Sequence, residues 1–334
     1  MKILVTGGAG FIGSNFIRLI LKKYPDYSII NLDKLTYAGN LNNLKDIEGN
    51  PNYKFIKGDI ADVRTVQKIL RLNHIDAIIN YAAETHVDRS IIDPAAFIRT
   101  DVMGTYNLLE GVKEFGIKKY IQISTDEVYG SIDKGKFAED SPFRPNSPYS
   151  ASKAGGDLLC RSYIKTYNLP IIVTHACNCY GPYQYPEKLI PLFITNLLER
   201  KKVPLYGQGS NIREWLFVTD HCLAIDFLLQ QGKVGEVYNI GSGVEKRNIQ
   251  ITKLIIGELG LSAEMIEKVQ DRLGHDLRYA LNCHKLNKLG FRPEYKFDDA
   301  IRETIRWYKN NDWWWRPLKS GQYLEYYKKQ YNQR

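Results

Sequence analysis

The sequence contains little that is typical of secreted or membrane-spanning chains. Its five cysteines are odd in number and scattered over 334 residues, which argues against a disulfide framework. No apolar run approaches the roughly 20 residues that span a bilayer, and no cleavable signal pattern follows Met1. We therefore expect a cytoplasmic protein with reduced thiols and no membrane association.

Metal and nucleic-acid sites are also not expected. Cys177 and Cys179 alternate on an extended segment after His175, without the wider gap that separates zinc-binding cysteines. The formal net charge is +9, but the Lys and Arg residues are spread over the whole chain without a dense basic block. A solvated surface and an anionic small substrate account for this charge better than nucleic acid does.

Short apolar runs alternate with amphipathic segments in the first half of the chain. This alternation is typical of an α/β fold, a doubly wound (Rossmann) parallel sheet with helices on both faces. The runs predict strands at Ile3–Thr6, Ser28–Asp33, Lys54–Lys57, Ala77–Asn80 and Tyr120–Ser124.

The pattern becomes irregular after Cys177, with loops rich in Pro, Gly and Tyr such as Tyr180–Pro186. A chain of 334 residues also exceeds the size at which one hydrophobic core usually stops growing. We predict that residues 1–177 mainly form the dinucleotide-binding Rossmann domain. Residues 178–334 would mainly form a smaller C-terminal substrate-binding lobe, with some segments returning to the Rossmann sheet.

A glycine motif follows the first predicted strand and opens a helix. Gly7, Gly10 and Gly13 let the backbone turn, approach a pyrophosphate and pack the helix on the strand. The helix N-terminus then faces the phosphates, because its free N–H groups attract anions. The spacing is Gly-x-x-Gly-x-x-Gly, and such glycines can also form a purely structural turn.

Asp33 adds a second, independent signal, since it ends the second predicted strand 20 residues after Gly13. A carboxylate there binds the ribose hydroxyls of adenosine and repels a 2′-phosphate. This favours NAD over NADP, although Lys34 places a positive charge beside Asp33. Asp59 and Ile60, after the third strand, either meet the adenine or form a simple turn.

Tyr149 and Lys153 are four residues apart, which places both side chains on one face of a helix. A nearby ammonium favours the phenolate, so we expect Lys153 to lower the pKa of Tyr149 toward that of a useful base. A chance pair is common in a sequence with 23 tyrosines. Combined with a dinucleotide-binding fold, however, this pair is the leading catalytic candidate.

Two adjacent carboxyl groups, Asp126 and Glu127, follow Thr125 at the end of the fifth predicted strand. Ligands of doubly wound sheets bind at this edge. The pair is either a solvent-exposed turn with a helix-capping Asp, or an acid and a base whose environments differ.

With these residues the chain resembles the extended short-chain dehydrogenase/reductases and, more closely, the dTDP-glucose 4,6-dehydratases. The likeness runs nearly end to end. It rests on Thr6–Gly13, Asp33–Asn40, Ala82–Asp88, Thr125–Gly130, Tyr149–Lys153, Pro186–Pro191, Arg213–Trp215 and Asp271–His275. The resemblance implies NAD as the cofactor and a nucleotide-diphosphate sugar, dTDP-glucose, as the substrate. It also implies a homodimer formed through helices near Pro94–Glu114 and Tyr149–Tyr167.

The resemblance further implies a reaction in which carbon 4 of the sugar is oxidised, water is removed across carbons 5 and 6, and the hydride returns to carbon 6. Tyr149 would take the proton of the 4-hydroxyl, Lys153 would bind the nicotinamide ribose, and Thr125 would hydrogen-bond the oxygen at carbon 4. Glu127 would remove the proton on carbon 5 while Asp126 protonates the departing 6-hydroxyl. The residue chemistry agrees, because loss of water needs an acid beside a base.

The resemblance also assigns binding residues. Those for NAD are Gly7, Gly10, Phe11, Ile12, Gly13, Asp33, Lys34, Leu35, Thr36, Asp59, Ile60, Ala82, Ala83, Glu84, Thr100, Tyr149 and Lys153. Those for the nucleotide sugar are His86, Thr125, Asn178, Glu187, Lys188, Leu189, Arg213, Asn248, Arg272 and His275. Arg213 and Arg272 suit a diphosphate, because a planar guanidinium can donate two parallel hydrogen bonds.

His175, Ala176 and Cys179 depart from the family pattern, and the family usually has Asn in place of Cys179, near the nicotinamide. Other functions of the same fold stay open, namely a UDP-sugar dehydratase, decarboxylase or 4-epimerase. A non-catalytic NAD-responsive regulator is a further alternative. Such regulators commonly lack the tyrosine or the lysine, both of which are present here. No motif distinguishes thymine from uracil.

Overall fold

The computed structural model describes residues 1–271, 275–321, 323–325 and 327. Its strands are β1 (Lys2–Thr6), β2 (Ser28–Asp33), β3 (Tyr53–Lys57), β4 (Ala77–Asn80), β5 (Lys119–Thr125), β6 (Ile171–Ala176), β7 (Asn178–Tyr180), β8 (Val203–Tyr206), β9 (Ile212–Phe217), β10 (Val237–Ile240), β11 (Glu245–Arg247) and β12 (Ile266–Val269). Its α-helices are α1 (Phe11–Lys23), α2 (Val63–Asn73), α3 (Val87–Ile92), α4 (Pro94–Phe97), α5 (Thr105–Phe115), α6 (Pro148–Tyr167), α7 (Leu189–Leu198), α8 (Val218–Gln231), α9 (Asn248–Glu258), α10 (His284–Leu289), α11 (Phe297–Asn310) and α12 (Asp312–Trp315). A π-helical turn occupies Ile98–Gly104, and 3₁₀ turns occupy Leu41–Ile47, Asp126–Tyr129, Ala263–Met265 and Pro317–Lys319.

The central sheet has seven parallel strands in the order β10-β6-β5-β4-β1-β2-β3. The chain order reverses between β1 and β4, and such a switch point opens a crevice at the carboxyl ends of the strands. The predicted α/β fold with a doubly wound parallel sheet is therefore confirmed. The five predicted strands match β1 to β5 within one residue at each end.

Helix α2 shows how the local sequence sets an element. Asp62 accepts a hydrogen bond from the backbone N–H of Arg64 and so caps the first turn. Val66, Ile69 and Leu70 recur at helical spacing and are buried. This apolar face is the part of the helix that packs on the sheet.

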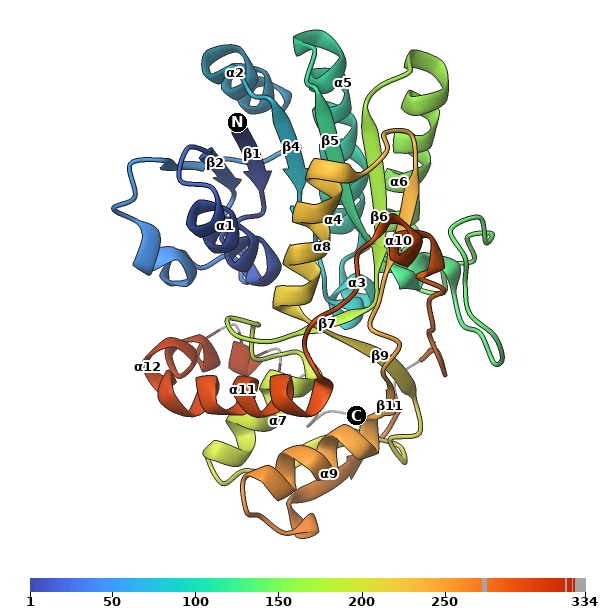
Figure 1. Cartoon of the computed structure of the whole chain (residues 1–334). Coiled ribbons are helices and arrows are strands. Elements are labelled where there is room, and N and C mark those ends of the chain that lie inside the picture. Colours follow the sequence, from blue (N-terminus) through green and yellow to red (C-terminus); the bar gives the residue numbers. More distant parts are fainter. Residues whose placement is uncertain (272–274, 322, 326, 328–334) are drawn as a thin grey trace.

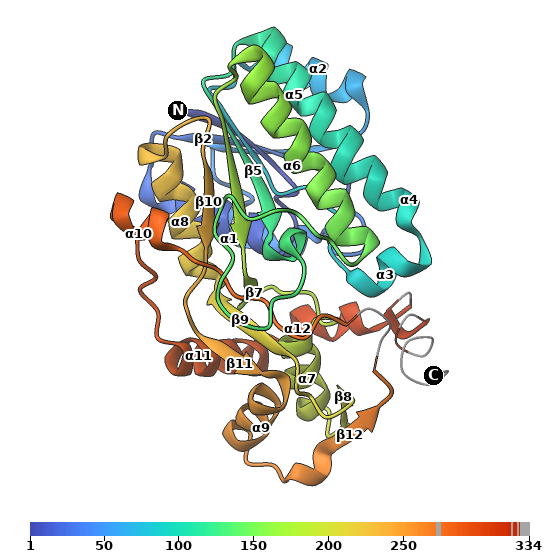
Figure 2. The ribbon, with the colours of Figure 1, turned by 90° about the vertical axis from the view of Figure 1, so that its right-hand side faces the viewer.

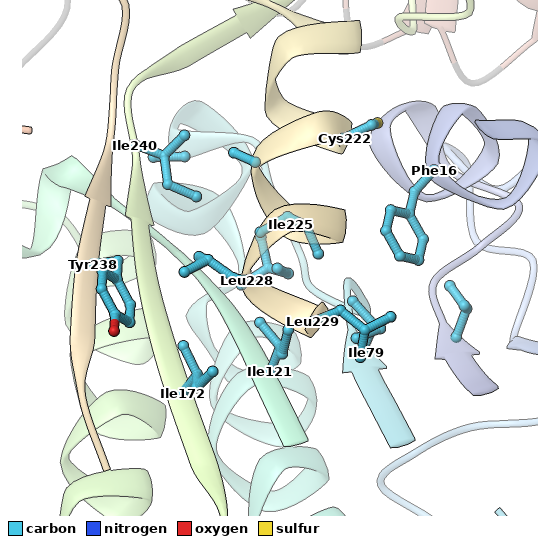
Figure 3. Close-up of a cluster of buried hydrophobic side chains, with 14 of the residues drawn as sticks. Phe16, Ile79, Ile121, Ile172, Cys222, Ile225, Leu228, Leu229, Tyr238 and Ile240 are labelled. Atoms are coloured by element: carbon cyan, nitrogen blue, oxygen red, sulfur yellow. The ribbon is translucent and has the colours of Figure 1, made fainter. Parts of the chain in front are cut away.

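The strands contribute to two separate cores, because successive side chains of a strand point to opposite faces. Ile79, Ile121 and Ile172 pack with α1 and α8 on one face (Figure 3). Ile78 and Tyr120 belong to the core under α2, α5 and α6 on the other face. Figures 1 and 2 show these two helix layers on either side of the sheet.

A smaller lobe lies at the carboxyl ends of the central strands (Figure 1). Its helices α7, α9 and α11 pack around a third core that includes Phe193, Ile255, Ile301 and Trp315. Two small sheets, β11-β9-β7 and β12-β8, belong to this part of the molecule. The lobe thus faces the edge of the sheet where ligands of this fold bind.

Two segments beyond residue 177 return to the central sheet. Strand β10 pairs with β6, and α8 packs beside α1 on the same face. Among the described residues, no helix has both the length and the apolar character that crossing a membrane requires.

Candidate active site

One cavity lies at the carboxyl ends of the central strands, near the switch point. Thr125, Asp126 and Glu127 line it, together with Asn178, Glu187 and Lys188 from the lobe. The residues predicted for NAD that line it are Gly7, Gly10, Phe11, Ile12, Gly13, Asp33, Lys34, Thr36, Asp59, Ile60, Ala82, Ala83, Glu84, Thr100, Tyr149 and Lys153. Folding therefore gathers residues from distant parts of the chain into a single site.

The glycine motif forms a tight cradle at the base of this cavity. Gly7 has a φ of +66°, and a Cβ on it would lie 2.6 Å from the backbone nitrogen of Ala82. A Cβ on Gly13 would lie 2.5 Å from the carbonyl oxygen of Gly7. Helix α1 begins after Gly10, which has no side chain to cap it. The first N–H groups of α1 can thus bind a phosphate in the cavity.

Asp33 lies at the end of β2, where its carboxylate accepts hydrogen bonds from the backbone N–H groups of Ala9 and Leu35, at 2.9 and 2.8 Å. Burial raises the pKa of Asp33, and these two hydrogen bonds oppose that rise. The Lys34 ammonium lies 3.2 Å from the Glu84 carboxylate. Because Glu84 neutralises its charge, Lys34 adds little attraction for a 2′-phosphate. Leu35 is not among the described residues that line the cavity.

Helix α6 presents Tyr149 and Lys153 to the end of β5. A capping box starts this helix: the Ser147 hydroxyl accepts from the Ser150 N–H, and the Ser150 hydroxyl accepts from the Ser147 N–H. Both Tyr149 and Lys153 are buried. The Lys153 ammonium donates a hydrogen bond to the carbonyl oxygen of Ile123 at 2.7 Å.

The expected lowering of the pKa of Tyr149 is wrong for this structure. Burial raises that pKa well above its ordinary value, and the negative charges of Glu127 and Asp101 add to the rise. A hydrogen bond with the Thr125 hydroxyl acts in the opposite direction. Sequence spacing placed the ammonium correctly on the same helix face, but it carried no information about desolvation.

Asp126 and Glu127 have different surroundings. Asp126 is only 1% exposed, and burial raises its pKa well above the ordinary value, with further rises from Glu127 and Glu214 and an opposing effect from Arg213. Glu127 is half-buried and lines the cavity. The Thr125 hydroxyl donates to Asp126 Oδ1 at 3.2 Å. A solvent-exposed turn is therefore excluded for Asp126, and the arrangement suits a protonated acid beside a second carboxyl group.

Arg89 and Tyr37 form a cluster with Glu187 that the sequence reasoning missed. The Nε and Nη2 groups of Arg89 both donate to Glu187 Oε2 at 3.1 Å, and the guanidinium lies 3.8 Å from the centre of the Tyr37 ring. The Lys188 ammonium donates to the carbonyl oxygen of Thr85. These contacts join the segment before α7 to the region around α3. Arg89 is one residue beyond the string Ala82–Asp88 and 98 residues from Glu187, so only the fold brings them together.

Comparisons with known proteins place the chain in a family. A family model described as GDP-mannose 4,6 dehydratase matches residues 4–304. A dTDP-glucose 4,6-dehydratase from Streptomyces niveus is 50% identical over 325 residues, which are 96% of each chain. The chain belongs to the dTDP-glucose 4,6-dehydratase family. The resemblance noted in the sequence is thereby confirmed.

Solved structures related to this dehydratase family share the fold. The crystal structure of DesIV, a dTDP-glucose 4,6-dehydratase from Streptomyces venezuelae with NAD bound, has a TM-score of 0.93 and 50% identity, and the match covers 96% of this chain and 100% of that chain. A UDP-glucose 4-epimerase from Thermotoga maritima has a TM-score of 0.87 and 29% identity, over 93% and 99% of the two chains. The fold is thus common to two reactions, and the site must distinguish them.

Some residues that the dehydratase family suggested for the sugar nucleotide lie in the lobe, outside the described lining of the cavity. Arg213, on β9, donates to the carbonyl oxygen of Asp276 at 3.0 Å, and its guanidinium lies 4.4 Å from the centre of the Tyr279 ring. The His275 ring contacts the Asp271 carboxylate at 2.6 Å. Arg213 is therefore held against residues 276–279, which follow His275 and lie beside β9.

The remaining residues suggested for the dehydratase substrate are spread over three helices. His86 precedes α3 and is buried, and Leu189 is the first residue of α7. Asn248 begins α9, and its side-chain oxygen is buried without a hydrogen-bond partner among the described residues. Arg272 lies outside the described residues.

The cavity also has lining residues that the sequence did not suggest. His221, on α8, is fully buried, and burial lowers its pKa to about 4. Sequence spacing gives no signal for it, because α8 reaches the cavity only by returning to the sheet. Other such residues are Tyr37, Gly39, Tyr81 and Tyr185. Cys179, which departs from the family pattern, also lines the cavity.

Proposed function

We propose that this chain is an NAD-dependent dTDP-glucose 4,6-dehydratase, a lyase that converts dTDP-glucose to dTDP-4-keto-6-deoxyglucose. The observation that carries this proposal is the buried Asp126, with its raised pKa, beside the half-buried Glu127 at the carboxyl end of β5. Loss of water needs a base at carbon 5 and an acid at the 6-hydroxyl, whereas 4-epimerisation needs only the base that serves the 4-hydroxyl. The identity of about half of all residues to named dTDP-glucose 4,6-dehydratases supports the choice of reaction and substrate.

The residues of the cavity fit NAD. The cradle at Gly7 and Gly13 and the uncapped start of α1 suit its pyrophosphate, and Asp33 suits the ribose hydroxyls of its adenosine. Lys153 would hold the nicotinamide ribose. When bound, NAD supplies the hydride acceptor for carbon 4 and the hydride donor for carbon 6.

The chain's own residues then move protons. Tyr149, as the phenolate, takes the proton of the sugar's 4-hydroxyl, and the Thr125 hydroxyl hydrogen-bonds the oxygen at carbon 4. Oxidation at carbon 4 acidifies the hydrogen on carbon 5, which Glu127 removes. Asp126, whose protonated form is favoured by burial, gives its proton to the departing 6-hydroxyl. Asp126 thus acts in the protonation state that its burial favours, whereas Tyr149 must lose its proton against the effect of burial.

The test uses Asp126→Asn and Glu127→Gln in heavy water, with dTDP-glucose and UDP-glucose as separate substrates. Asp126→Asn should keep oxidation and deuterium exchange at carbon 5 while loss of the 6-hydroxyl slows. Glu127→Gln should abolish that exchange, because a neutral amide cannot take the proton, and dehydration should fail with it. Asp140→Asn, at an exposed carboxyl group, is the control and should behave as the wild type. If both site variants form the 4-keto product at the wild-type rate, the dehydratase assignment of the pair is wrong.

We also propose that two copies of the chain form a homodimer through the helices near α5 and α6. Helices α5 and α6 lie side by side in Figure 2. Support comes from the exposed apolar side chains on these helices and on the π-helical turn before α5, which are Ile98, Met103, Tyr106, Leu158 and Tyr167. Leu158→Lys should convert the dimer to a monomer in analytical ultracentrifugation. Leu72→Lys, at an exposed leucine on α2, is the matched control and should leave the dimer intact. A monomeric wild type would refute the proposal.

The division of labour between the two parts of the chain is a further proposal. Residues 1–177 would mainly bind NAD and residues 178–334 mainly the nucleotide sugar, while β10 and α8 complete the Rossmann part. Its support is that the glycine cradle and Asp33 lie in the first segment, and Arg213 and Asn248 lie in the second.

We also propose that the enzyme acts in the cytoplasm, supported by its free cysteines.

A further inference from the structure

A buried hydrogen-bond network lies directly behind the catalytic candidates. Its centre is His175 on β6, which is 1% exposed. His175 Nδ1 lies 2.6 Å from the hydroxyl of Tyr129, and Nε2 lies 3.1 Å from Asp157 Oδ2. Asp157 Oδ2 also accepts a hydrogen bond from the Ser124 hydroxyl at 2.6 Å. Both ring nitrogens are therefore engaged, each with a different element of the fold.

The two partners of His175 belong to the two elements that carry the chemistry. Tyr129 ends the 3₁₀ turn that begins with Asp126 and Glu127. Asp157 lies on α6, eight residues after Tyr149 and four residues after Lys153. All three side chains therefore share one face of the helix.

The sheet register explains why β6 can make this link. His175 is the direct neighbour of Ser124 in the parallel pairing of β5 with β6, one position before Thr125. The Tyr129 hydroxyl also donates to Asn239 on β10 at 3.0 Å, which anchors the turn to the next strand of the sheet. The network thus connects the strand end, the turn and the helix at one level of the sheet.

We propose that His175 is a positioning residue. It holds the 3₁₀ turn of Asp126 and Glu127 in a fixed position relative to helix α6, which carries Tyr149 and Lys153. This inference rests on the proposed dehydratase function and adds a residue that does not touch the substrate. Displacement of a reacting group by about 1 Å can cost on the order of 100-fold in rate. Hydrogen bonds from one rigid ring to both elements limit such a displacement.

The proposal makes the two sides of the network separable by kinetics. Tyr129→Phe releases the turn, so elimination should slow about ten-fold while oxidation continues, and NADH absorbance should accumulate during turnover. Ser124→Ala loosens the contact of α6 with β5, so oxidation should slow without such accumulation. His175→Asn is too short to bridge both partners and should lower kcat at least ten-fold, with the KM values for dTDP-glucose and NAD changed less than about two-fold.

Thr174→Val is the matched control. Thr174 is the neighbour of His175 on β6, is fully buried, and donates one hydrogen bond, to the carbonyl oxygen of Gln122. Loss of this hydrogen bond should lower Tm without changing the relative rates of oxidation and elimination. If Tyr129→Phe and His175→Asn change only Tm, as Thr174→Val does, His175 is a structural residue and the proposal is wrong. Should His175→Asn fail to fold, Tyr129→Phe decides.

A measurement without turnover keeps this inference separate from the proposed function. The Tm losses of Tyr129→Phe and Ser124→Ala should be non-additive when His175 is present, because both act on one network. They should become additive in the His175→Asn background. Additive losses in both backgrounds would overturn the coupling, whereas coupled losses in an enzyme that forms no 4-keto product would refute only the dehydratase function.

Discussion

The cofactor end and the sugar end of the site are built in different ways. At the cofactor end the backbone makes the site: the turn at Gly7, the uncapped start of α1 and the end of β2 at Asp33. At the end proposed for the sugar, contacts between long side chains, such as that of Arg89 with Glu187, join segments far apart in the sequence. A site built by backbone is encoded in short strings, whereas a site built by side chains depends on how distant segments pack.

The largest expected effect tests whether the chemistry belongs to the backbone-built end. Tyr149→Phe should lower kcat about 100-fold or more, because the ionisable oxygen is lost while the ring still fills its buried position. NAD affinity should change less than about two-fold, since the glycine cradle is untouched. Steady-state kinetics and NAD titration check both statements. Near wild-type turnover would exclude Tyr149 as the base.

The second prediction concerns a buried carboxyl group at the same end. Burial raises the pKa of Asp101 from 3.8 to about 6, although the Ser152 hydroxyl donates to it at 2.7 Å. Because the folded state holds this proton more tightly than the unfolded state, stability falls as the pH rises from about 4 to about 6.

Asp101→Asn cannot ionise, so it should stabilise the protein by about 3 kcal/mol above pH 7 and by almost nothing below pH 4. Thermal unfolding of variant and wild type across this pH range measures the difference. Asp140→Asn, at an exposed carboxyl group, serves as the control. An equal effect of Asp101→Asn at pH 4 and pH 8 would contradict the assigned pKa.

A smaller effect tests the side-chain-built end. Arg213→Lys keeps the positive charge that acts on Asp126 but loses the planar guanidinium, so the KM for dTDP-glucose should rise about 20-fold. The kcat and the affinity for NAD should stay within about two-fold. Arg302→Lys, at an exposed arginine paired with Glu258, is the matched control. A lower Tm with an unchanged KM would make Arg213 a purely structural residue.

The smallest effect returns to the cofactor end. Asp33→Ala should weaken NAD about ten-fold, through loss of the hydrogen bonds to the ribose, and should partly relieve the exclusion of NADP. Titration of both cofactors measures this. Because Asp33 also accepts hydrogen bonds from Ala9 and Leu35, the Tm is recorded alongside. Unchanged NAD affinity would place Asp33 outside the site.

The difference between backbone-built and side-chain-built parts of the site also explains which features could be predicted from the sequence. The strands β1 to β5 were predictable, because apolar runs and turn residues are local signals. Arg89 and His221 were not predicted, since the contact of Arg89 with Glu187 and the position of His221 at the cavity depend on how distant segments pack. The direction of the pKa shift of Tyr149 was predicted wrongly, because helix spacing shows the ammonium and not the burial.

By itself, the sequence determined the doubly wound sheet, the glycine cradle and the neighbouring positions of Asp126 and Glu127, because periodicity, backbone freedom and adjacency are local properties. Only the tertiary structure decided that Asp126 is buried and that its pKa is raised. It alone also linked His175 to both Tyr129 and Asp157. The physical reason is that desolvation and the electric field at a side chain are set by all the residues packed around it, most of which are distant in the sequence.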